Sequence, residues 1–348
     1  MGKQKAGYAV FLLPPWATFL VASCGGDQAR PACPGDLHDG GDGMCVSIGE
    51  CSNGFSLGGD GRCAAWTIGP SLTQRRFNHT ETALDDGRVL VAGGFDPSGI
   101  RLASAEIYDP ASNVWSQLAP LMQGRFDHTA TKLESGRVLM VGGTETGQGS
   151  VEVFDPSSNT WVQVNPVPGN LKISGHAATR LRDGSVLVAG GGSGLGTVYD
   201  SAFVYSPQTG QWTEVGRLAN ERMWTGGALL ADGRVLVGGG AGPNTDSAAP
   251  ITAEIYDPGN RTFSPAPNML AVYHFPLVFG LPDGQVLTVG GSSERFVDGV
   301  WNATSPMNIY RDDAAGTVFP DGRVLVAGGR DNQSLTSVEI FDPVVDRW

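Results

Sequence analysis

The chain alternates short, almost wholly apolar runs with polar turns rich in glycine, and this alternation returns along most of its length. Each copy has a turn of the form Asp-Gly-Arg, or a close variant, followed by a Val-Leu-Val run that ends in two glycines. Asp-Gly and Ser-Gly turns between apolar runs signal tight β-hairpins. A run that is apolar throughout indicates a strand buried on both faces. The pattern therefore predicts an all-β protein. The turn glycines are Gly87, Gly136, Gly184, Gly233, Gly284 and Gly322.

Successive turn glycines are separated by 49, 48, 49, 51 and 38 residues. A period near fifty residues with a paired glycine is typical of a β-propeller, in which each repeat forms one blade. Each repeat also contains a third strand with alternating polarity, such as residues 104–110, and a fourth strand that opens on an aromatic residue. These fourth-strand aromatics are Trp66, Trp115, Trp161, Trp212, Phe263, Trp301 and Trp348.

The double glycine, the aromatic residue before a turn and the following tryptophan resemble the Kelch repeat, and the resemblance covers residues 66–348. It implies four-stranded blades around a central channel. Six blades are expected, with the strand after Trp66 pairing with the last blade to close the ring; a truncated ring of seven blades is the alternative. The fifth repeat is short between Gly291 and Trp301, so it has lost most of a strand or the loop before it.

Charge and cysteine content restrict the function. The formal net charge is −12, which argues against binding nucleic acid or an anionic membrane through a basic patch. All five cysteines lie before residue 64, which favours a small cysteine-rich segment in an oxidising compartment.

Residues 1–23 have the form of a secretory signal, with Lys3 and Lys5 ahead of an apolar run. Residues 21–24 resemble a bacterial lipobox, which implies cleavage before Cys24, acylation of that cysteine and a lipid anchor in the cell envelope, at the outer membrane or the cell surface. An ordinary signal peptide with an incidental cysteine is the alternative.

Residues 24–65 are expected to form a spacer of two tandem units, 33–45 and 51–63, each with Gly-Gly-Asp-Gly at the same offset. One disulfide within each unit is the preferred arrangement, although four cysteines allow three pairings. Calcium is disfavoured because the EF-hand pattern is missing, and zinc because the gaps between cysteines are long. The cysteines concerned are Cys33, Cys45, Cys51 and Cys63.

Polar residues recur just before the first strand of each repeat, and these positions should gather at one mouth of the channel. The Kelch resemblance implies that this loop and the loop after Gly-Gly form the ligand-binding face. Trp224 and Tyr273 add aromatic rings suited to stacking on sugars or anchoring a protein loop, although Trp224 could equally pack between blades. The candidate ligand-binding residues are Arg76, His79, Arg125, His128, His176, Arg222, Trp224, Thr225, Tyr273, Arg311 and Arg330.

A structural role for these recurring residues is the competing interpretation, because a position repeated in every blade often holds the ring together. The recurring strand-three glutamates, among them Glu106 and Glu152, are expected to be structural. Histidines at matching places in neighbouring blades should lie too far apart to share one metal ion, so no metal and no cofactor are expected.

We expect a monomeric binding or scaffold protein that recognises a protein or glycan. A sugar-epimerase-like enzyme is the alternative, and a purely structural envelope protein is not separated from the first by any motif. A copper-radical oxidase is disfavoured, because that chemistry needs a cysteine cross-linked to tyrosine and no cysteine follows Cys63.

Overall fold

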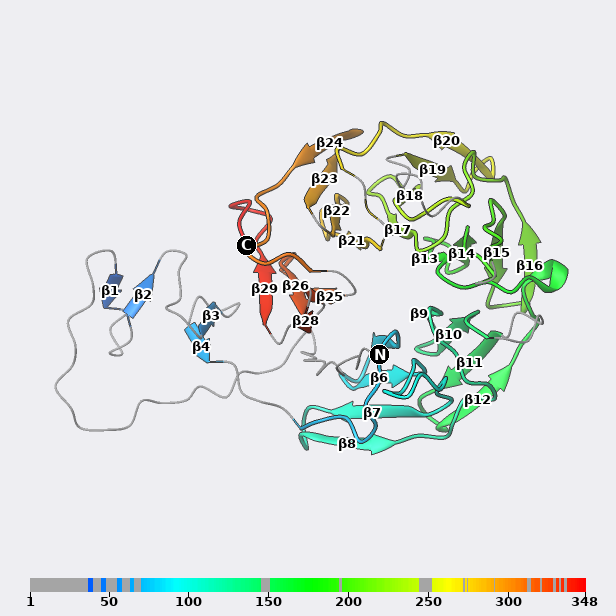
Figure 1. Cartoon of the computed structure of the whole chain (residues 1–348), viewed down its shortest axis with the longest axis horizontal. Helices are drawn as coiled ribbons and strands as arrows, with labels where there is room; N and C mark the ends of the chain where they lie inside the picture. The colour runs from blue at the N-terminus through cyan, green and yellow to red at the C-terminus, as the bar shows by residue number, and fades with distance from the viewer. Residues whose placement is uncertain are drawn as a thin grey trace, which may run out of the picture. The chain divides into compact units, whose positions relative to one another are not determined.

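The computed structural model describes most of the repeat region. It covers residues 70–144, 151–193, 196–243, 252–271, 273, 275–290, 292–311, 314–319, 321–327 and 337–348, together with the backbone of short strands within 37–65 and 330–334. The chain divides into two compact units, of which Trp16–Pro70 is one and Met1–Pro15 with Ser71–Trp348 is the other. In the second unit six antiparallel sheets are arranged in a ring (Figure 1). This confirms the all-β propeller of six blades.

The first three blades are four-stranded meanders, with the first strand innermost and the fourth outermost (Figure 1). Blade one contains β5 (Thr80–Ala83), β6 (Val89–Ala92), β7 (Ala105–Asp109) and β8 (Val114–Gln117). Blade two contains β9 (Thr129–Lys132), β10 (Val138–Val141), β11 (Val151–Asp155) and β12 (Thr160–Gln163), followed by a 3-10 turn at Pro168–Asn170. Blade three contains β13 (Ala177–Arg180), β14 (Val186–Ala189), β15 (Ala202–Ser206) and β16 (Gln211–Glu214).

Blades four and five repeat this order, and blade six has a three-stranded sheet. Blade four contains β17 (Gly226–Leu229), β18 (Val235–Gly238), β19 (Ala253–Asp257) and β20 (Thr262–Pro265). Blade five contains β21 (Leu277–Gly280), β22 (Val286–Val289), β23 (Ser293–Val297) and β24 (Val300–Ala303). Blade six contains β25 (Ala315–Val318), β26 (Val324–Ala327) and β29 (Val338–Phe341), with the small hairpin β27 (Arg330–Asp331) and β28 (Gln333–Ser334) between the last two.

The two cysteine-rich units form matching hairpins in the backbone. β1 (Leu37–Asp39) pairs with β2 (Cys45–Ser47), and β3 (Phe55–Leu57) pairs with β4 (Cys63–Ala65). In each hairpin the second cysteine opens the second strand. The side chains of these residues, the signal segment, Cys24 and the predicted disulfides lie outside the described residues. Among the described residues no helix is long and apolar enough to cross a membrane.

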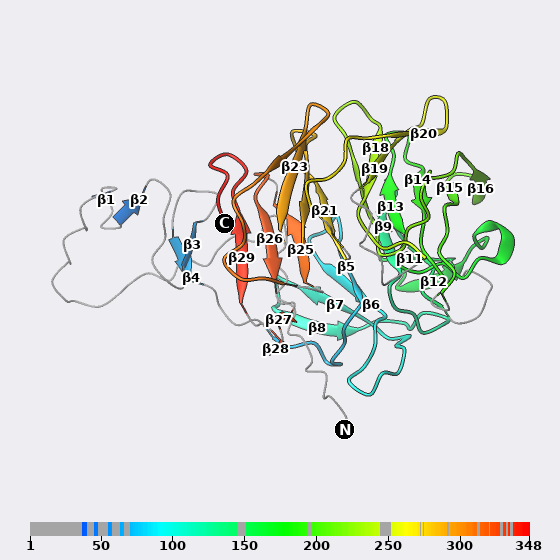
Figure 2. The ribbon, with the colours of Figure 1, turned by 45° about the horizontal axis from the view of Figure 1, so that its top comes forward.

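The hydrophobic core lies between blades rather than inside any one of them. Each second strand is fully buried, because sheets pack against both of its faces. Five clusters of buried apolar side chains fill the five seams from blade one to blade six. Figure 2 shows neighbouring blades standing side by side. Each seam thus takes one face from each of two neighbouring blades, as in other repeat architectures.

An aromatic pair joins the third and fourth strands of every blade. Tyr108 and Trp115 of blade one lie directly opposite each other, with ring centroids 5.2 Å apart. In blade six Phe341 and Trp348 keep the same spacing of 5.2 Å, although only the bridge between Asp342 and Arg347 stands for the fourth strand. Residues 66–69 lie outside the described residues, so closure of blade six by the strand after Trp66 stays a prediction.

Blade five has all four strands, so its short repeat reflects a lost loop. β22 ends at Val289 and β23 begins at Ser293, and the Gly290 amide donates to the Ser292 carbonyl at 2.9 Å. A two-residue turn at Asp298 and Gly299, both with positive φ, then joins β23 to β24. The missing residues therefore belong to the loop that follows Gly-Gly in the other blades.

The paired glycines of blades one to four connect each of these blades to the next. The amides of Gly94, Gly143, Gly191 and Gly240 each donate to a carbonyl in the following blade, at 2.7–2.8 Å. All four have positive φ, between 77° and 95°. A Cβ atom on Gly143 would lie 2.3 Å from the Phe126 carbonyl oxygen. Only glycine fits, because the backbones approach too closely for a side chain and the conformation is left-handed.

Replacing Gly143 with alanine should therefore destabilise the protein by more than left-handed backbone strain alone would. We expect Gly143→Ala to lower the free energy of unfolding by about 3 kcal/mol or more, from strain plus the steric clash. Gly99 is the matched control, because it has φ of 82° but a Cβ atom added there would meet no atom within 4 Å. Gly99→Ala should cost about 1 kcal/mol. Urea unfolding of the full chain measures both, and equal losses would contradict the close-approach explanation.

Candidate functional site

The loop that precedes the first strand of each blade is called here the lead-in loop. Four of the predicted site residues are arginines on these loops, and all four are buried inside their own blades. Arg76 donates to the carbonyls of Gly93 at 2.8 Å and Ser104 at 3.0 Å, and to the carboxylate of Glu106 at 2.8 Å. The same arrangement recurs in blades two, four and six. The other pairs are Arg125 with Glu152, Arg222 with Glu254 and Arg311 with Glu339.

The glutamate of each pair accepts hydrogen bonds from backbone amides of the lead-in loop. Glu106 accepts from the amides of Thr73 at 2.6 Å and Gln74 at 3.1 Å, and Glu339 accepts from Asn308 at 2.7 Å and Ile309 at 3.1 Å. Burial alone would raise the pKa of Glu106, but the hydrogen bonds from Thr73 and Arg76 outweigh it and lower that pKa. Because the terminal nitrogens of each guanidinium and the carboxylate that faces them are bonded within the blade, these groups fix the loops.

Two blades depart from this pair in different ways. Blade three replaces both members with apolar residues, Ile173 and Phe203, and both are buried. Blade five keeps Glu294 but has Tyr273 in the arginine position. With no arginine beside it, burial raises the pKa of Glu294, which still accepts from the Leu270 amide at 2.7 Å.

The sequence suggested that Tyr273 presents its ring at the mouth, but the ring is buried. It is 2% exposed, because it fills the space that arginine occupies in other blades. Its hydroxyl accepts from Ser292 at 3.2 Å, and burial raises its pKa. Thr225 is also buried and donates to the Gly238 carbonyl at 2.9 Å. The side chain of Arg330 lies outside the described residues.

The predicted histidines link neighbouring blades. His128 Nε2 lies 2.8 Å from the Thr80 hydroxyl of blade one, and His176 Nε2 lies 2.8 Å from the Thr129 hydroxyl of blade two. Burial, with the positive charge of Arg125, holds the pKa of His128 well below its usual value, and burial lowers that of His176 to about 3. Both rings are therefore neutral at physiological pH and packed into seams.

His79 lies apart from these pairs, with Nε2 3.2 Å from Glu81. The histidines are thus not brought around one point. In the described part of the chain, no group of three or more His, Cys, Asp or Glu side chains could hold a metal ion.

Trp224 is the candidate residue that reaches across the channel mouth. Its φ of 54° is left-handed, which is uncommon for a bulky residue and costs on the order of 1–3 kcal/mol. Its indole N–H donates to Asp127 of blade two at 3.3 Å, passing over Gly175 of blade three. Its ring lies 4.6 Å from that of Phe275 of blade five. The contacts of this one side chain therefore span four consecutive blades at the mouth.

Residues at the Trp224 position of other blades lie beside it, and together they form what is called here the rim. Asn78 of blade one donates to Asp127 at 3.0 Å, and the Gly175 amide donates to the Asp127 carbonyl at 2.8 Å. Asn78 and Asp127 share the positive φ of Trp224. Sequence reasoning missed Asn78, Asp127 and Phe275. The signal was present, since each stands nine residues before its turn glycine, where the side chain changes from blade to blade.

A second aromatic group lies on the loops of blades one and two. Phe95 lies 5.4 Å from Phe77 and 4.4 Å from Phe126, measured between ring centroids. The guanidinium of Arg101 stands 4.8 Å from the Phe126 centroid, in cation–π distance. These four side chains are half-buried, and Phe77 and Phe126 directly precede Asn78 and Asp127 in the chain.

Comparisons with known proteins agree with this architecture. Residues 76–122, 175–218 and 314–348 match the Kelch motif. Together with the six-bladed fold, these three matches support a Kelch-type β-propeller. No curated protein matches the chain in sequence.

Among solved structures, a fungal alcohol oxidase of the AA5 family, solved in complex with copper, is similar with a TM-score of 0.59 and 18% identity. The match covers 78% of this chain and 61% of the oxidase, so this chain spans less than two thirds of that protein. YjhT is similar with a TM-score of 0.62 and 14% identity, over 79% of this chain and 100% of YjhT. At these identities the similarity shows the fold alone.

The buried ion pairs can be tested against the apolar pair of blade three. Arg222→Ile leaves Glu254 buried without its cation, and we expect it to lower the free energy of unfolding by about 3–5 kcal/mol. The double change Arg222→Ile with Glu254→Phe copies Ile173 and Phe203, so it should cost less than the single change. Chemical unfolding of the four proteins of this double-mutant cycle measures the coupling. If the double variant is less stable than Arg222→Ile, an apolar pair cannot replace the ion pair in this blade, and the prediction is wrong.

Proposed function

We propose that this protein is a non-catalytic binding module that recognises a glycan or a protein at the rim formed by Asn78, Asp127, Trp224 and Phe275. The observation that carries the proposal is Trp224, a bulky residue in a left-handed conformation whose indole reaches another blade. Backbone strain of this kind is kept where the surrounding structure enforces it, and it clusters at ligand-binding positions.

The chemistry of this rim suits recognition of a polar ligand that has an apolar face. Phe275 is 42% exposed and stacks near Trp224, while Asn78 and Asp127 supply amide and carboxylate groups beside the rings. Aromatic faces next to hydrogen-bonding groups favour sugars and protein loops. The buried arginines support the lead-in loops from below, so the rim is largely preorganised, which lowers the entropic cost of binding.

The rim residues provide a direct test of the proposed function. Trp224→Asn removes the ring but keeps a residue that blade one already places at positive φ, so the fold should be retained. Together with Phe275→Ala it should weaken binding at least about tenfold, because buried aromatic anchors dominate binding energy. Binding of the full chain is measured on a glycan array and, in parallel, by pull-down from envelope extract.

Val300→Ala is the control for that test, because Val300 is an exposed apolar residue on the outer strand β24. It should leave binding unchanged. If a captured glycan or protein is bound equally by the rim variant and by the Val300 variant, the rim is not the recognition site.

The proposal includes a lipid tether, which would hold the propeller at the cell envelope. It is supported by the lipobox-like residues 21–24 and by five cysteines, of which four remain to pair once Cys24 is acylated. Mass spectrometry of the chain isolated from membranes should find a diacylglyceryl group on an N-terminal Cys24. Cys24→Ala should release the protein from the membrane fraction. A mature chain that carries no lipid would contradict the tether but not the recognition site.

A further inference from the structure

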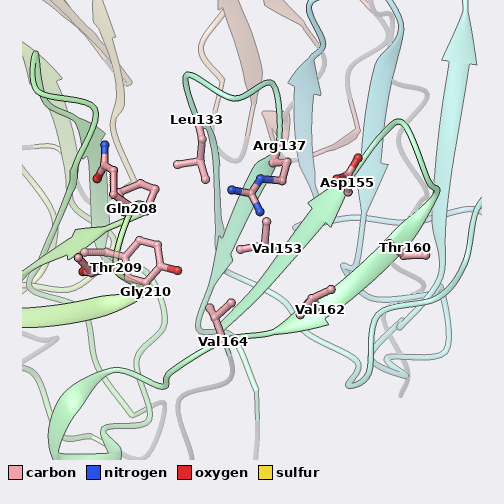
Figure 3. A pocket seen from close by; sticks show the side chains of 12 residues that line it. Leu133, Arg137, Val153, Asp155, Thr160, Val162, Val164, Gln208, Thr209 and Gly210 are labelled. Atoms are coloured by element: carbon pink, nitrogen blue, oxygen red, sulfur yellow. The ribbon is translucent and has the colours of Figure 1, made fainter.

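A pocket of about 340 Å³ lies between blades two and three, away from the channel mouth. Its apolar wall consists of Leu133, Val153, Val162 and Val164, and the turn between β15 and β16 forms the opposite side (Figure 3). This turn and the turn before β10 lie at the ends of the strands opposite the lead-in loops. The pocket is therefore distinct from the rim around Trp224.

Arg137 lines this pocket, and the repeats show why its side chain is available. In three other blades the corresponding arginine is held by the aspartate two residues before it. The distances between arginine nitrogen and carboxylate oxygen are 2.6 Å for Arg88 and Asp86, 2.6 Å for Arg234 and Asp232, and 2.8 Å for Arg323 and Asp321. These pairs confine each guanidinium to its own hairpin turn.

Blade two has Ser135 in place of that aspartate. Within the described structure, Arg137 donates only to the Ser135 hydroxyl, at 3.2 Å, and forms no ion pair. Its guanidinium points into the pocket, beside Val153 (Figure 3). A single change from acid to serine thus turns a structural arginine into one that can bind an anion.

The surroundings of Arg137 also favour an anion. Blade three has Ser206 where blades one, two, four and six have the first aspartate of the corresponding turn, so a second carboxylate is replaced beside this seam. Tyr205 lines the pocket and is 2% exposed, yet its hydroxyl has no hydrogen bond in the described structure. By contrast, the equivalent Tyr108 donates to Asn113 at 2.7 Å. Tyr205 therefore supplies a second free donor.

One acid remains in the pocket. Asp155 accepts from the amide and the hydroxyl of Ser157, at 2.9 and 2.6 Å, and these hydrogen bonds, with a smaller contribution from Arg137, lower its pKa. Its carboxylate is thus satisfied largely by its own turn. Guanidinium and phenol donors above an apolar wall match a ligand that has one carboxylate and a compact hydrophobic body.

We propose that this pocket binds a small organic carboxylate with an apolar body, with Arg137 and Tyr205 holding the carboxylate and the valines of blade two holding the body. The proposal stands on this pocket alone and does not depend on the rim function. It identifies blade two as the copy in which loss of the turn aspartate has created a binding site.

The probe for this pocket is 3-phenylpropionate, with its neutral amide as the matched ligand. Titration calorimetry of the full chain should detect the carboxylate with a dissociation constant on the order of 1 mM, the range for a fragment of this size. The amide should bind about tenfold more weakly, because it loses the charge-assisted hydrogen bonds. Arg137→Gln should weaken binding of the carboxylate by a similar factor, and Tyr205→Phe should weaken that binding less.

Ser135→Asp is the most specific variant, because it restores the turn of blades one, four and six and should return Arg137 to an ion pair. It should weaken carboxylate binding about tenfold with no loss of thermal stability. Arg88→Gln is the control, since it removes the same charge from a turn whose arginine is already paired, and it should leave binding unchanged. The proposal is overturned if carboxylate and amide bind equally, or if Arg88→Gln and Arg137→Gln weaken binding to the same extent.

Discussion

Most of the propeller depends on one position of the lead-in loop, an arginine in four blades, because the residue there acts on two blades at once. Its carbonyl accepts the amide of the second glycine of the preceding blade, as when Gly94 donates to Arg125 at 2.7 Å. Its guanidinium meanwhile pairs with the strand-three glutamate of its own blade, Glu152. A seam between blades and a loop within a blade are thus fixed by one residue. Burial strengthens this arrangement, since unpaired charges or amides would be costly there.

Blades three and five show which part of this arrangement is required. The backbone contact survives in both, through the carbonyls of Ile173 and Tyr273, which accept from Gly143 and Gly240 at 2.8 Å. The side-chain pair does not survive, since blade three is apolar and blade five keeps a glutamate with a raised pKa. The seam therefore needs the glycine and the carbonyl, whereas the ion pair can be exchanged for packing. This agrees with the general finding that buried ion pairs contribute less than their geometry suggests.

At both ends of the ring, the candidate binding residues stand where one blade departs from the repeat pattern. At the mouth, Trp224 stands where other blades have Asn78, Asp127 or Gly175, and its ring crosses to blade two. At the opposite end, Ser135 replaces an aspartate, and Arg137 forms no ion pair with any residue that the structure describes. The regular positions hold the ring together, so a single substitution can alter the surface without disturbing the seams. Repeat folds allow this because the interfaces between neighbouring repeats are formed by the regular positions.

The sequence by itself determined the all-β fold and the strand order and favoured six blades, because hairpin turns, apolar runs and paired glycines are local patterns that recur in register. It also indicated that the recurring Glu106 and its equivalents are structural. Only the tertiary structure decided that Arg76 and its equivalents point into their blades, that Tyr273 is buried, and that Trp224 meets Asp127, 97 residues away. The reason is physical: the period places a residue at the mouth, but the direction of its side chain depends on partners supplied by other strands and other blades.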